Sequence, residues 1–352
     1  MQQRRSTSTK SGETVKPLGT AIIGCGSISG VHLKAIAGLE LAELKAVVDI
    51  NESLAQKAAA EYGCDYYTDY KEMLKREDIQ VVHICTGHYL HAPMTVDALR
   101  AGKHVLTEKP MAENKASAMT MLQAAQEHPE VQLGVIFQNR YNPSSVRMRQ
   151  AVDSGEFGKL QCMKGIVTWF RGPGYYETEW KGKWATEGGG VLINQAIHTL
   201  DLLQWLGGEM TSVKGTISND SLEGVIEVED SAHAFIQFKN GVRAVFYATN
   251  AYGKSAPIEV ELVFEQATLS LRGDTLYLQQ DDQVTVLAEP VKNDLGEKAY
   301  WGMSHQYQIR DFYEHVLEGK HFWIDGPEGY KGFSLVMDIY ESSRTGQKIV
   351  YE

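Results

Sequence analysis

A lysine and a histidine are candidates for chemistry, because each is a polar residue in or directly after an apolar stretch of the sequence. Lys109 follows the apolar segment of "HVLTEKP", and Pro110 restricts the lysine backbone. His198 lies in the helix-like stretch "GGGVLINQAIHTLDLLQWLG", four residues after Asn194, so the two are expected on one helix face. An ammonium group stabilises developing negative charge, and an imidazole exchanges a proton near neutral pH. The plain alternatives are a surface Glu-Lys pair and a structural core histidine.

A glycine-rich turn follows the first apolar strand, and an aspartate closes the second. In "GCGSISG", Gly24 permits a tight turn, Gly26 lets the backbone approach a pyrophosphate, and Ser29 takes the usual third glycine position. The helix that follows points its free N–H groups at that phosphate. Asp49 stands at the fingerprint distance, where it accepts hydrogen bonds from ribose hydroxyls and repels a 2′-phosphate. Asp49 therefore favours NAD over NADP. The alternative to a dinucleotide site is a glycine turn in an unrelated α/β fold, with Asp49 as a helix cap.

The order of predicted elements changes near residue 140. Strand-like and helix-like segments alternate up to that point, which predicts a parallel sheet covered by helices on both faces. Strand-like segments then dominate, and Asn240-Gly241 between two of them indicates a type I′ hairpin. We expect a disordered arm over 1–16, a doubly wound dinucleotide-binding domain over 17–140, and an α+β domain with a large open, mainly antiparallel sheet for substrate binding and oligomerisation over 141–352.

Composition and charge narrow the class of protein. The chain has 352 residues, of which 43% are hydrophobic and 22% charged, as in a globular protein of two domains. A net charge of −11 argues against nucleic-acid and anionic-membrane partners, and no apolar run is long enough for a membrane span. The cysteines are scattered without a C-x-x-C pair, which predicts free, buried thiols and a cytoplasmic location; they are Cys25, Cys64, Cys85 and Cys162.

Three blocks carry a resemblance to a known family that covers nearly all of residues 18–350: "GCGSISGVH", "TGHYLHAPMTVDALRAGKHVLTEKPMA" and "GGGVLINQAIHTLDLLQWL". Together they resemble the glucose–fructose oxidoreductase / inositol dehydrogenase family, often written Gfo/Idh/MocA. The segments "QNRYNP" and "WFRGPGYYETEWKGKWATEGGG" look most like its branch of UDP-N-acetylglucosaminuronate 3-dehydrogenases. The resemblance implies a Rossmann domain, a second domain with a large open sheet, and oxidation or reduction of a ring hydroxyl of a sugar or cyclitol.

The resemblance also implies roles for single residues. Lys109 would contact the reacting hydroxyl, and His198 would be the general base that takes the hydroxyl proton as hydride leaves for the nicotinamide. Asn194 would contact the substrate, and His305, at the start of a predicted carboxyl-terminal helix, is a separate candidate for a substrate contact. The cofactor contacts expected are Gly24, Gly26, Ser27, Ile28, Asp49, Thr86, His91 and Glu108.

Two departures from the family pattern bear on the chemistry. Inositol dehydrogenases usually carry aspartate where this chain has Asn194; an amide cannot act as an acid or base, so more of the proton work falls on His198. Gly87 and His88 replace a usual proline and asparagine, and His91 keeps its place, where it would position Lys109 or the cofactor. A histidine pair without a third ligand does not suggest a metal site, and we expect none.

Other candidate substrate contacts lie after the last predicted strand of the first domain. Arg140, in "QNRYNP", is expected to bind a polar substrate group. A loop rich in aromatic residues and glycine either holds the sugar ring or packs on a neighbouring subunit; it contains Tyr175, Tyr176, Trp180, Lys181 and Trp184, of which Tyr176 and Trp184 are the substrate candidates.

We therefore expect an NAD-dependent oxidoreductase that transfers hydride to or from a secondary ring hydroxyl of a sugar, at the 3 position and with a nucleotide-linked substrate as specific options. The alternatives are a cyclitol dehydrogenase, an enzyme that cycles trapped NAD, and a non-catalytic sensor of NAD(H) or sugar. An open sheet of this kind is normally covered by a symmetry mate, so a homodimer or homotetramer is expected.

Overall fold

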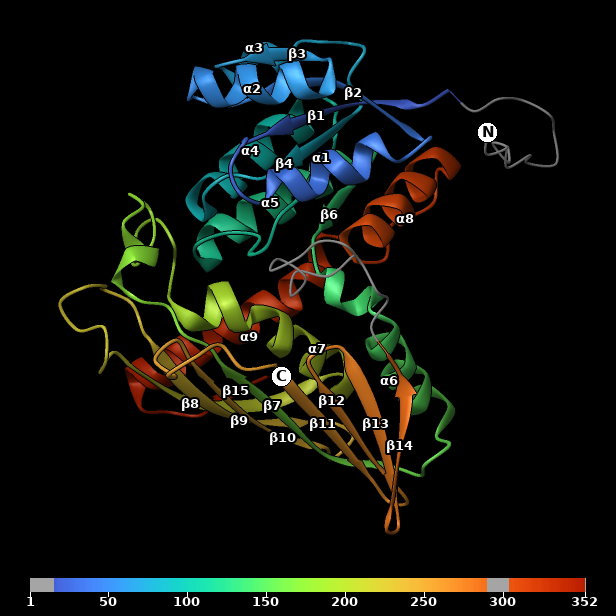
Figure 1. The fold of residues 1–352 in the computed structure, drawn as a ribbon, viewed down its shortest axis with the longest axis vertical. Coiled ribbons are helices and arrows are strands. Elements are labelled where there is room, and N and C mark those ends of the chain that lie inside the picture. Colours follow the sequence, from blue (N-terminus) through green and yellow to red (C-terminus); the bar gives the residue numbers. More distant parts are fainter. Residues whose placement is uncertain (1–15, 290–303, 352) are drawn as a thin grey trace.

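The computed structural model describes residues 16–289 and 304–351 (Figure 1). Two sheets organise the chain: a six-stranded sheet in the amino-terminal half and a nine-stranded sheet in the carboxyl-terminal half. This confirms the expected fold class, a Rossmann sheet followed by a large, mainly antiparallel sheet. The arm expected over 1–16 falls, apart from Lys16, outside the described residues.

The first sheet has the doubly wound strand order β3-β2-β1-β4-β5-β6, and every pair in it is parallel. Strand β4 is buried at all of its positions, as expected for a parallel strand covered on both faces. The strands are β1 (Leu18–Ile23), β2 (Ala42–Val48), β3 (Asp65–Tyr67), β4 (Val81–Ile84), β5 (His104–Thr107) and β6 (Leu133–Val135).

Helices connect these strands, and side chains cap several of them. Asn51, Asp69 and Asn114 accept backbone N–H groups at the starts of α2, α3 and α5, which satisfies donors that the first helical turn leaves free. The helices are α1 (Ser29–Ala37), α2 (Glu52–Tyr62), α3 (Tyr70–Leu74), α4 (His88–Arg100) and α5 (Lys115–Glu127). The 3-10 helix η1 (Gln138–Tyr141) and α6 (Pro143–Ser154) lead to the second sheet.

The second sheet has the order β14-β13-β12-β11-β7-β10-β9-β8-β15. It is mixed, because β10 pairs with β7 in parallel while the other pairs are antiparallel. Its strands are β7 (Leu160–Thr168), β8 (Met210–Ser218), β9 (Ser231–Phe238), β10 (Arg243–Thr249), β11 (Glu259–Phe264), β12 (Thr268–Arg272), β13 (Thr275–Gln280), β14 (Gln283–Ala288) and β15 (Ile349–Val350).

The two faces of this sheet differ. One face packs against α7 (Ile197–Gly207) and α9 (Gly326–Thr345), so alternate residues such as Ile236 and Phe246 are buried. The opposite face carries exposed apolar side chains, including Phe235 at 41% and Val245 at 50% exposure. The period-two alternation along β9 and β10 is what a half-buried sheet produces.

The last helices return to the first sheet. Helix α8 (Ser304–Glu318) packs against α1 and η1. The Tyr313 hydroxyl on α8 lies 2.8 Å from Thr20 Oγ1 and 3.0 Å from His83 Nε2. Ile324, which follows α8, accepts the backbone N–H of Val135 on β6. The carboxyl-terminal end of the chain thus completes the core of the amino-terminal half.

Some expectations about local structure need correction or refinement. The hairpin at Asn240-Gly241 is not type I′: only the glycine has positive φ, and Gly241 N–H donates to Phe238 O, so the turn has the geometry of a longer hairpin loop with glycine in the left-handed region. The cysteines are free as expected, although only Cys85 is fully buried. Across the described residues, no helix is long and apolar enough to cross a membrane.

Candidate active site

A cavity of about 970 Å³ opens at the carboxyl ends of the parallel strands of the first sheet. Its lining runs from the glycine turn after β1 to residues of η3 (Leu192–Ala196), α7 and the loop after β7. Ligands of doubly wound sheets bind at this edge, where the strand order reverses. The sequence-predicted residues that line it are Gly24, Gly26, Ser27, Ile28, Asp49, Thr86, His91, Glu108, Lys109, Asn194, His198 and His305.

The glycine turn leaves room for a phosphate group. Gly24 has a φ of +96°, and a Cβ atom there would lie 2.5 Å from Cys85 O, so the turn excludes other residues. A Cβ atom at Gly26 would meet no atom within 4 Å, because this glycine faces open space. Ser29 Oγ donates to Gly26 O at 2.7 Å and fixes the turn against the start of α1. The residues present fit a dinucleotide pyrophosphate.

Asp49 closes β2 with its carboxylate directed back at the glycine turn. Its Oδ2 accepts Cys25 N–H at 2.8 Å, and its Oδ1 accepts Asn51 N–H at 2.8 Å. Each carboxylate oxygen has a further lone pair for an external donor. The backbone bonds therefore orient the carboxylate for ribose hydroxyls, as the fingerprint predicts.

Lys109, Asn194 and His198 line the cavity together. Lys109 Nζ donates to the backbone oxygen of Asn194 at 2.8 Å and lies 3.5 Å from its side-chain Oδ1. The ring of His198 packs edge-on against Phe137 with centroids 6.0 Å apart, and its Nδ1 has no hydrogen-bond partner among the described residues. A strand end, a π turn and an α-helix thus place an ammonium, an amide and an imidazole at one surface.

The surroundings shift the proton affinity of both catalytic candidates. Burial lowers the pKa of the Lys109 ammonium, while the charges of Glu108 and Glu187 oppose that shift. Burial and, next, the charge of Lys109 lower the pKa of His198 well below its usual range. His198 is therefore neutral at ordinary pH, the state in which an imidazole accepts a proton.

The helix that carries Asn194 and His198 is not α-helical throughout. Residues Leu192–Ala196 form a π turn, and the α-helix begins only at Ile197. The predicted i, i+4 spacing on one α-helix is corrected in this detail, although both side chains line the cavity. π turns inside helices occur frequently at functional sites.

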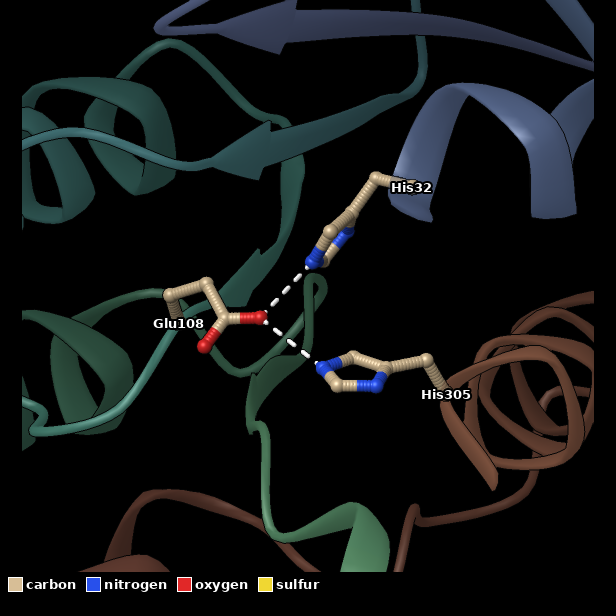
Figure 2. Close-up of side chains that lie close together, drawn as sticks. All are labelled: His32, Glu108 and His305. Carbon is tan, nitrogen blue, oxygen red and sulfur yellow. Dashed lines mark hydrogen bonds and ion pairs between the residues drawn. The ribbon is translucent and has the colours of Figure 1, made fainter. Parts of the chain in front are cut away.

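Glu108 contacts side chains from two other elements beneath the cavity (Figure 2). Its Oε1 accepts from His32 Nε2 on α1 at 2.8 Å and lies 3.2 Å from His305 Nε2 on α8, while its Oε2 accepts Lys109 N–H at 3.2 Å. Burial raises the pKa of Glu108, but the hydrogen bonds from His305 and His32 outweigh burial and hold it well below its usual range. Glu108 therefore anchors the backbone of Lys109 as a carboxylate.

The contacts behind Glu108 extend deeper into the fold. His32 Nδ1 lies 2.8 Å from His83 Nδ1, and His83 Nε2 lies 3.0 Å from the Tyr313 hydroxyl. Burial lowers the pKa of His32 and of His83, so neutral rings that donate in series toward Glu108 satisfy every contact. Within the described residues, His32, Glu108 and His305 bring ligand atoms within 4.8 Å of one another, as a metal site would. The hydrogen bonds account for this geometry.

His91 and His88 hold loops around the site. His91 Nδ1 lies 2.7 Å from Pro110 O, and its Nε2 lies 3.1 Å from Thr86 O, which supports the expected positioning role beside Lys109. His88 packs against Trp180, with ring centroids 4.8 Å apart. A Cβ atom at Gly87 would lie 3.2 Å from the Tyr89 ring and 3.4 Å from Trp180, so this turn packs closely against both side chains.

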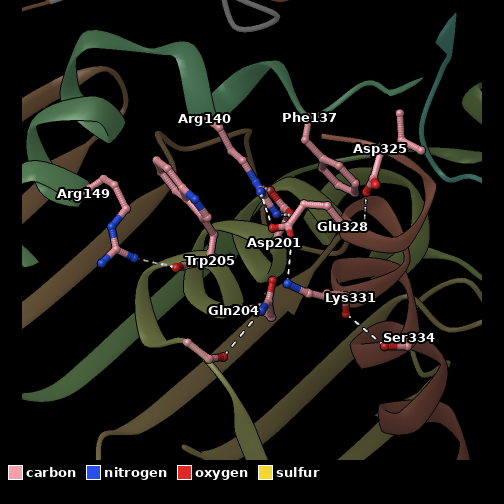
Figure 3. A network of polar contacts seen from close by, with 12 residues as sticks. Phe137, Arg140, Arg149, Asp201, Gln204, Trp205, Asp325, Glu328, Lys331 and Ser334 are labelled. Carbon is pink, nitrogen blue, oxygen red and sulfur yellow. Dashed lines mark hydrogen bonds and ion pairs between the residues drawn. The ribbon is translucent and has the colours of Figure 1, made fainter. Parts of the chain in front are cut away.

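The expected substrate contact of Arg140 is corrected by the structure (Figure 3). Arg140 is only 1% exposed and does not line the cavity. Its Nε and Nη2 donate to Asp201 at 2.8 and 2.7 Å, and its Nη1 donates to Glu328 at 2.7 Å. Two carboxylates thus accept the hydrogen bonds of the guanidinium. These ion pairs join Arg140 on η1 to Asp201 on α7 and to Glu328 on α9.

Tyr176 and Trp184 lie outside the cavity lining, so the structure does not bring these two predicted substrate contacts to the site. The Tyr176 hydroxyl accepts Asn250 Nδ2 at 3.0 Å, and its ring packs against a small apolar cluster. Trp184 Nε1 donates to Glu227 O at 2.9 Å, and its ring meets Tyr340. From the same loop, Tyr175, Trp180 and Lys181 do line the cavity.

Sequence reasoning missed Glu187. It is 1% exposed, and its Oε1 accepts Asn194 Nδ2 at 2.5 Å. Burial raises the pKa of the Glu187 carboxyl to about 7. The signal in the sequence was an acidic residue directly before the glycine run 188–190, since the helix that follows carries the site.

The chain matches two family descriptions. Residues 18–137 match an oxidoreductase family with an NAD-binding Rossmann fold, and residues 145–270 match a GFO/IDH/MocA C-terminal domain. The uncharacterised oxidoreductase YrbE of Bacillus subtilis is 30% identical over 70% of this chain and 71% of its own length. D-glucoside 3-dehydrogenase of Escherichia coli is 27% identical over 97% of this chain and 99% of its own.

A solved structure shows the same architecture throughout. The WlbA dehydrogenase from Bordetella pertussis, in complex with NADH and UDP-GlcNAcA, is 28% identical to this chain with a TM-score of 0.85. The superposition covers 97% of this chain and 99% of that one. The similarity therefore includes both sheets.

Proposed function

The chain belongs to the Gfo/Idh/MocA family of NAD-binding oxidoreductases, and we propose that it oxidises or reduces a secondary ring hydroxyl of a sugar derivative. The observation that carries the proposal is the convergence of Lys109, Asn194 and His198 on a cavity that also contains the glycine turn and Asp49. A protein that only binds a dinucleotide has no need of an ammonium and a neutral imidazole at that surface. D-glucoside 3-dehydrogenase among the relatives makes the 3-hydroxyl the first position to test.

Each side chain has a separate task in this proposal. The nicotinamide, when bound, supplies the hydride acceptor or donor. Lys109 stabilises the alkoxide that develops on the substrate oxygen, because its ammonium lies in a buried site of low polarity. His198, held neutral by burial, accepts the hydroxyl proton during oxidation and returns it during reduction. Asp49 and the glycine turn hold the cofactor.

Two cations in the cavity favour a substrate with an acidic group. Arg171 and Lys181 line the cavity beside Tyr175: Lys181 Nζ lies 3.6 Å and Arg171 Cζ 5.2 Å from the ring centroid. Among the described residues neither cation lies within ion-pair distance of a carboxylate. Arg171 Nη1 donates to Phe170 O at 2.8 Å and to Ser255 Oγ at 3.3 Å, and Glu179 and Asp274 also line the cavity. Unpaired cations beside a reacting centre suit a carboxylate or a phosphate, and UDP-GlcNAcA bound to WlbA carries both.

The test is turnover on matched neutral and acidic substrates. We expect NADH formation with NAD and a sugar acid or a nucleotide-linked sugar, and a KM at least about tenfold higher for that substrate in Arg171→Ala. A neutral glycoside, as the control, should show the same KM in both proteins. Turnover of neutral sugars alone would reject the acidic preference, and absence of turnover across the panel would reject the dehydrogenase proposal unless NAD(H) copurifies, which would instead indicate cycling of trapped cofactor.

We also propose that the open face of the nine-stranded sheet binds a second copy of the chain. On β9 and β10, Phe235 pairs with Val245 across the strands, and Tyr247 lies on the same face; all are at least 41% exposed. An exposed apolar stripe on a sheet is normally covered. Light scattering should give a multiple of 39.2 kDa, and Val245→Glu should lower it. A monomeric wild-type protein would reject this proposal.

A further inference from the structure

The amide of Asn194 is held between two opposite charges. On one side, its Nδ2 donates to Glu187 Oε1 at 2.5 Å, and Glu187 Oε2 accepts Gly182 N–H at 2.5 Å. On the other side, Lys109 Nζ bonds the Asn194 backbone oxygen and lies 3.5 Å from Oδ1. Glu187 itself does not line the cavity, so it reaches the reaction only through its neighbours.

This arrangement fixes which end of the amide faces the lysine. An ionised carboxylate only accepts hydrogen bonds, and an ammonium only donates them. A reversed Asn194 amide would set its oxygen against Glu187 and its NH₂ group against Lys109. The carboxylate of Glu187 therefore excludes the reversed orientation and directs Oδ1 at the ammonium.

We propose that Glu187 is a positioning residue: through the amide of Asn194 it orients an acceptor at Lys109 and adds the negative charge that position 194 lacks. The inference rests on the proposed dehydrogenase function. Position 194 carries a neutral amide, and the buried carboxylate of Glu187 lies directly behind it. Asn194 thus supplies the acceptor and Glu187 the negative charge.

Several charged or titratable groups surround Glu187. Lys109 faces it from the segment after β5 and Lys181 from its own loop. Tyr175 faces it from the 3-10 helix η2 (Pro173–Tyr176) and Tyr340 from α9, and His88 Nδ1 lies 2.7 Å from its backbone oxygen. Burial raises the pKa of Glu187 to about 7, although the bonds from Gly182 and Asn194 and the two lysines oppose the rise. Its charge therefore changes near neutral pH.

The expected pH dependence has a defined sign. As the pH falls through about 7, Glu187 takes up a proton and ceases to exclude the reversed amide, so kcat declines. The pKa of His198 is lowered well below its usual range, so the loss of the base falls at lower pH and is separable. As the pH rises, loss of the Lys109 proton ends activity, and the charge of Glu187 delays that loss because it raises the pKa of Lys109.

The test compares two buried glutamates at the same helix start. Glu187→Gln should lower kcat about 10- to 100-fold, the effect of misplacing an oriented group, with an unchanged KM for NAD. In the profile of kcat against pH, the decline near neutral pH should disappear, and the decline at alkaline pH should move to lower pH. Glu229→Gln is the matched control, because Glu229 bonds Gly190 N–H and Leu192 N–H but not Asn194. Equal shifts in both variants, or a wild-type profile in Glu187→Gln, would overturn the inference.

A second measurement needs no turnover. Competitive acetylation of Lys109 across pH, read by peptide mass spectrometry, reports its pKa directly; we expect a lower pKa in Glu187→Gln and none of this change in Glu229→Gln. An inactive wild-type protein would reject the dehydrogenase proposal. The pKa of Lys109 would still be measurable by acetylation and would still test the role of Glu187. If Glu187→Gln does not fold, Asn194→Ala gives the same test, because removing the amide should lower kcat and abolish the limb near pH 7 while Glu187 is intact. An unchanged limb in Asn194→Ala would overturn the inference.

Discussion

The phosphate and ribose part of the cofactor side draws on one stretch of chain, residues 24–49, where backbone N–H groups orient Asp49 and glycine leaves open space. The substrate side draws on side chains from the end of β5, the loop before residue 188, η3 and α7. Backbone geometry changes little with the surrounding charges. The substrate side depends on charges whose protonation burial controls, as for Lys109, Glu187 and His198.

Substitutions on the cofactor side and on the substrate side should therefore impair the enzyme in different ways. A change on the cofactor side should act on binding of NAD and leave the chemical step intact. A change on the substrate side should act on kcat and on its pH dependence, because the groups there matter most in the transition state.

The sharpest contrast is expected from Lys109→Ala. Without the ammonium, the developing alkoxide loses its stabilising charge, and kcat should fall about 10²- to 10³-fold. NADH binding, measured by fluorescence titration, should stay within about twofold of wild type, since the glycine turn and Asp49 are intact. A comparable loss of NADH affinity would mean that the two sides are not separate.

Glu229→Gln tests how burial controls the protonation of a carboxyl group. Burial raises the pKa of Glu229 from 4.5 to about 7, so the folded state holds a proton that the unfolded state releases. Its contribution to stability is therefore complete below pH 4.5 and is lost as the pH rises through about 7. The variant should gain stability relative to wild type across that window, by up to about 3 kcal/mol. Thermal unfolding of both proteins at several pH values measures this; a constant difference would contradict it.

Gly26→Val tests the space for the pyrophosphate. A branched side chain would fill the open volume at this turn, and the affinity for NADH should fall about 10- to 100-fold while the residual kcat at saturation is kept. Gly30→Ala is the control, because a Cβ atom at Gly30 also meets nothing within 4 Å but lies in α1 rather than in the turn. Equal losses in the two variants would argue against a phosphate site at Gly26.

Asp49→Ala should have the smallest effect. Loss of the carboxylate removes one charge-assisted acceptor for a ribose hydroxyl and the repulsion of a 2′-phosphate, so the preference for NAD over NADP should fall about tenfold. The ratio of kcat/KM for NAD to that for NADP measures this preference. Asp49→Asn keeps one acceptor oxygen, so its ratio should lie between those of the wild type and Asp49→Ala. An unchanged ratio would remove Asp49 from cofactor discrimination.

The local parts of the site were readable in the sequence. The turn at Gly24 and Gly26, the helix after it and Asp49 at the end of β2 are near one another along the chain, and steric limits on the backbone fix their geometry. Lys109 and His198 were singled out through the resemblance to the family, and the structure places both side chains in the cavity lining.

Only the tertiary structure decided how the buried charges pair. Arg140 resembled a substrate contact but bonds Asp201 and Glu328, and Glu187 resembled a loop residue but bonds Asn194. Their partners lie 61, 188 and 7 residues away. Burial makes an unpaired charge costly, so each such group must find a partner, but the fold alone sets which partner is within reach. Sequence thus determined the backbone-built half of the site, and packing determined the half that depends on charge.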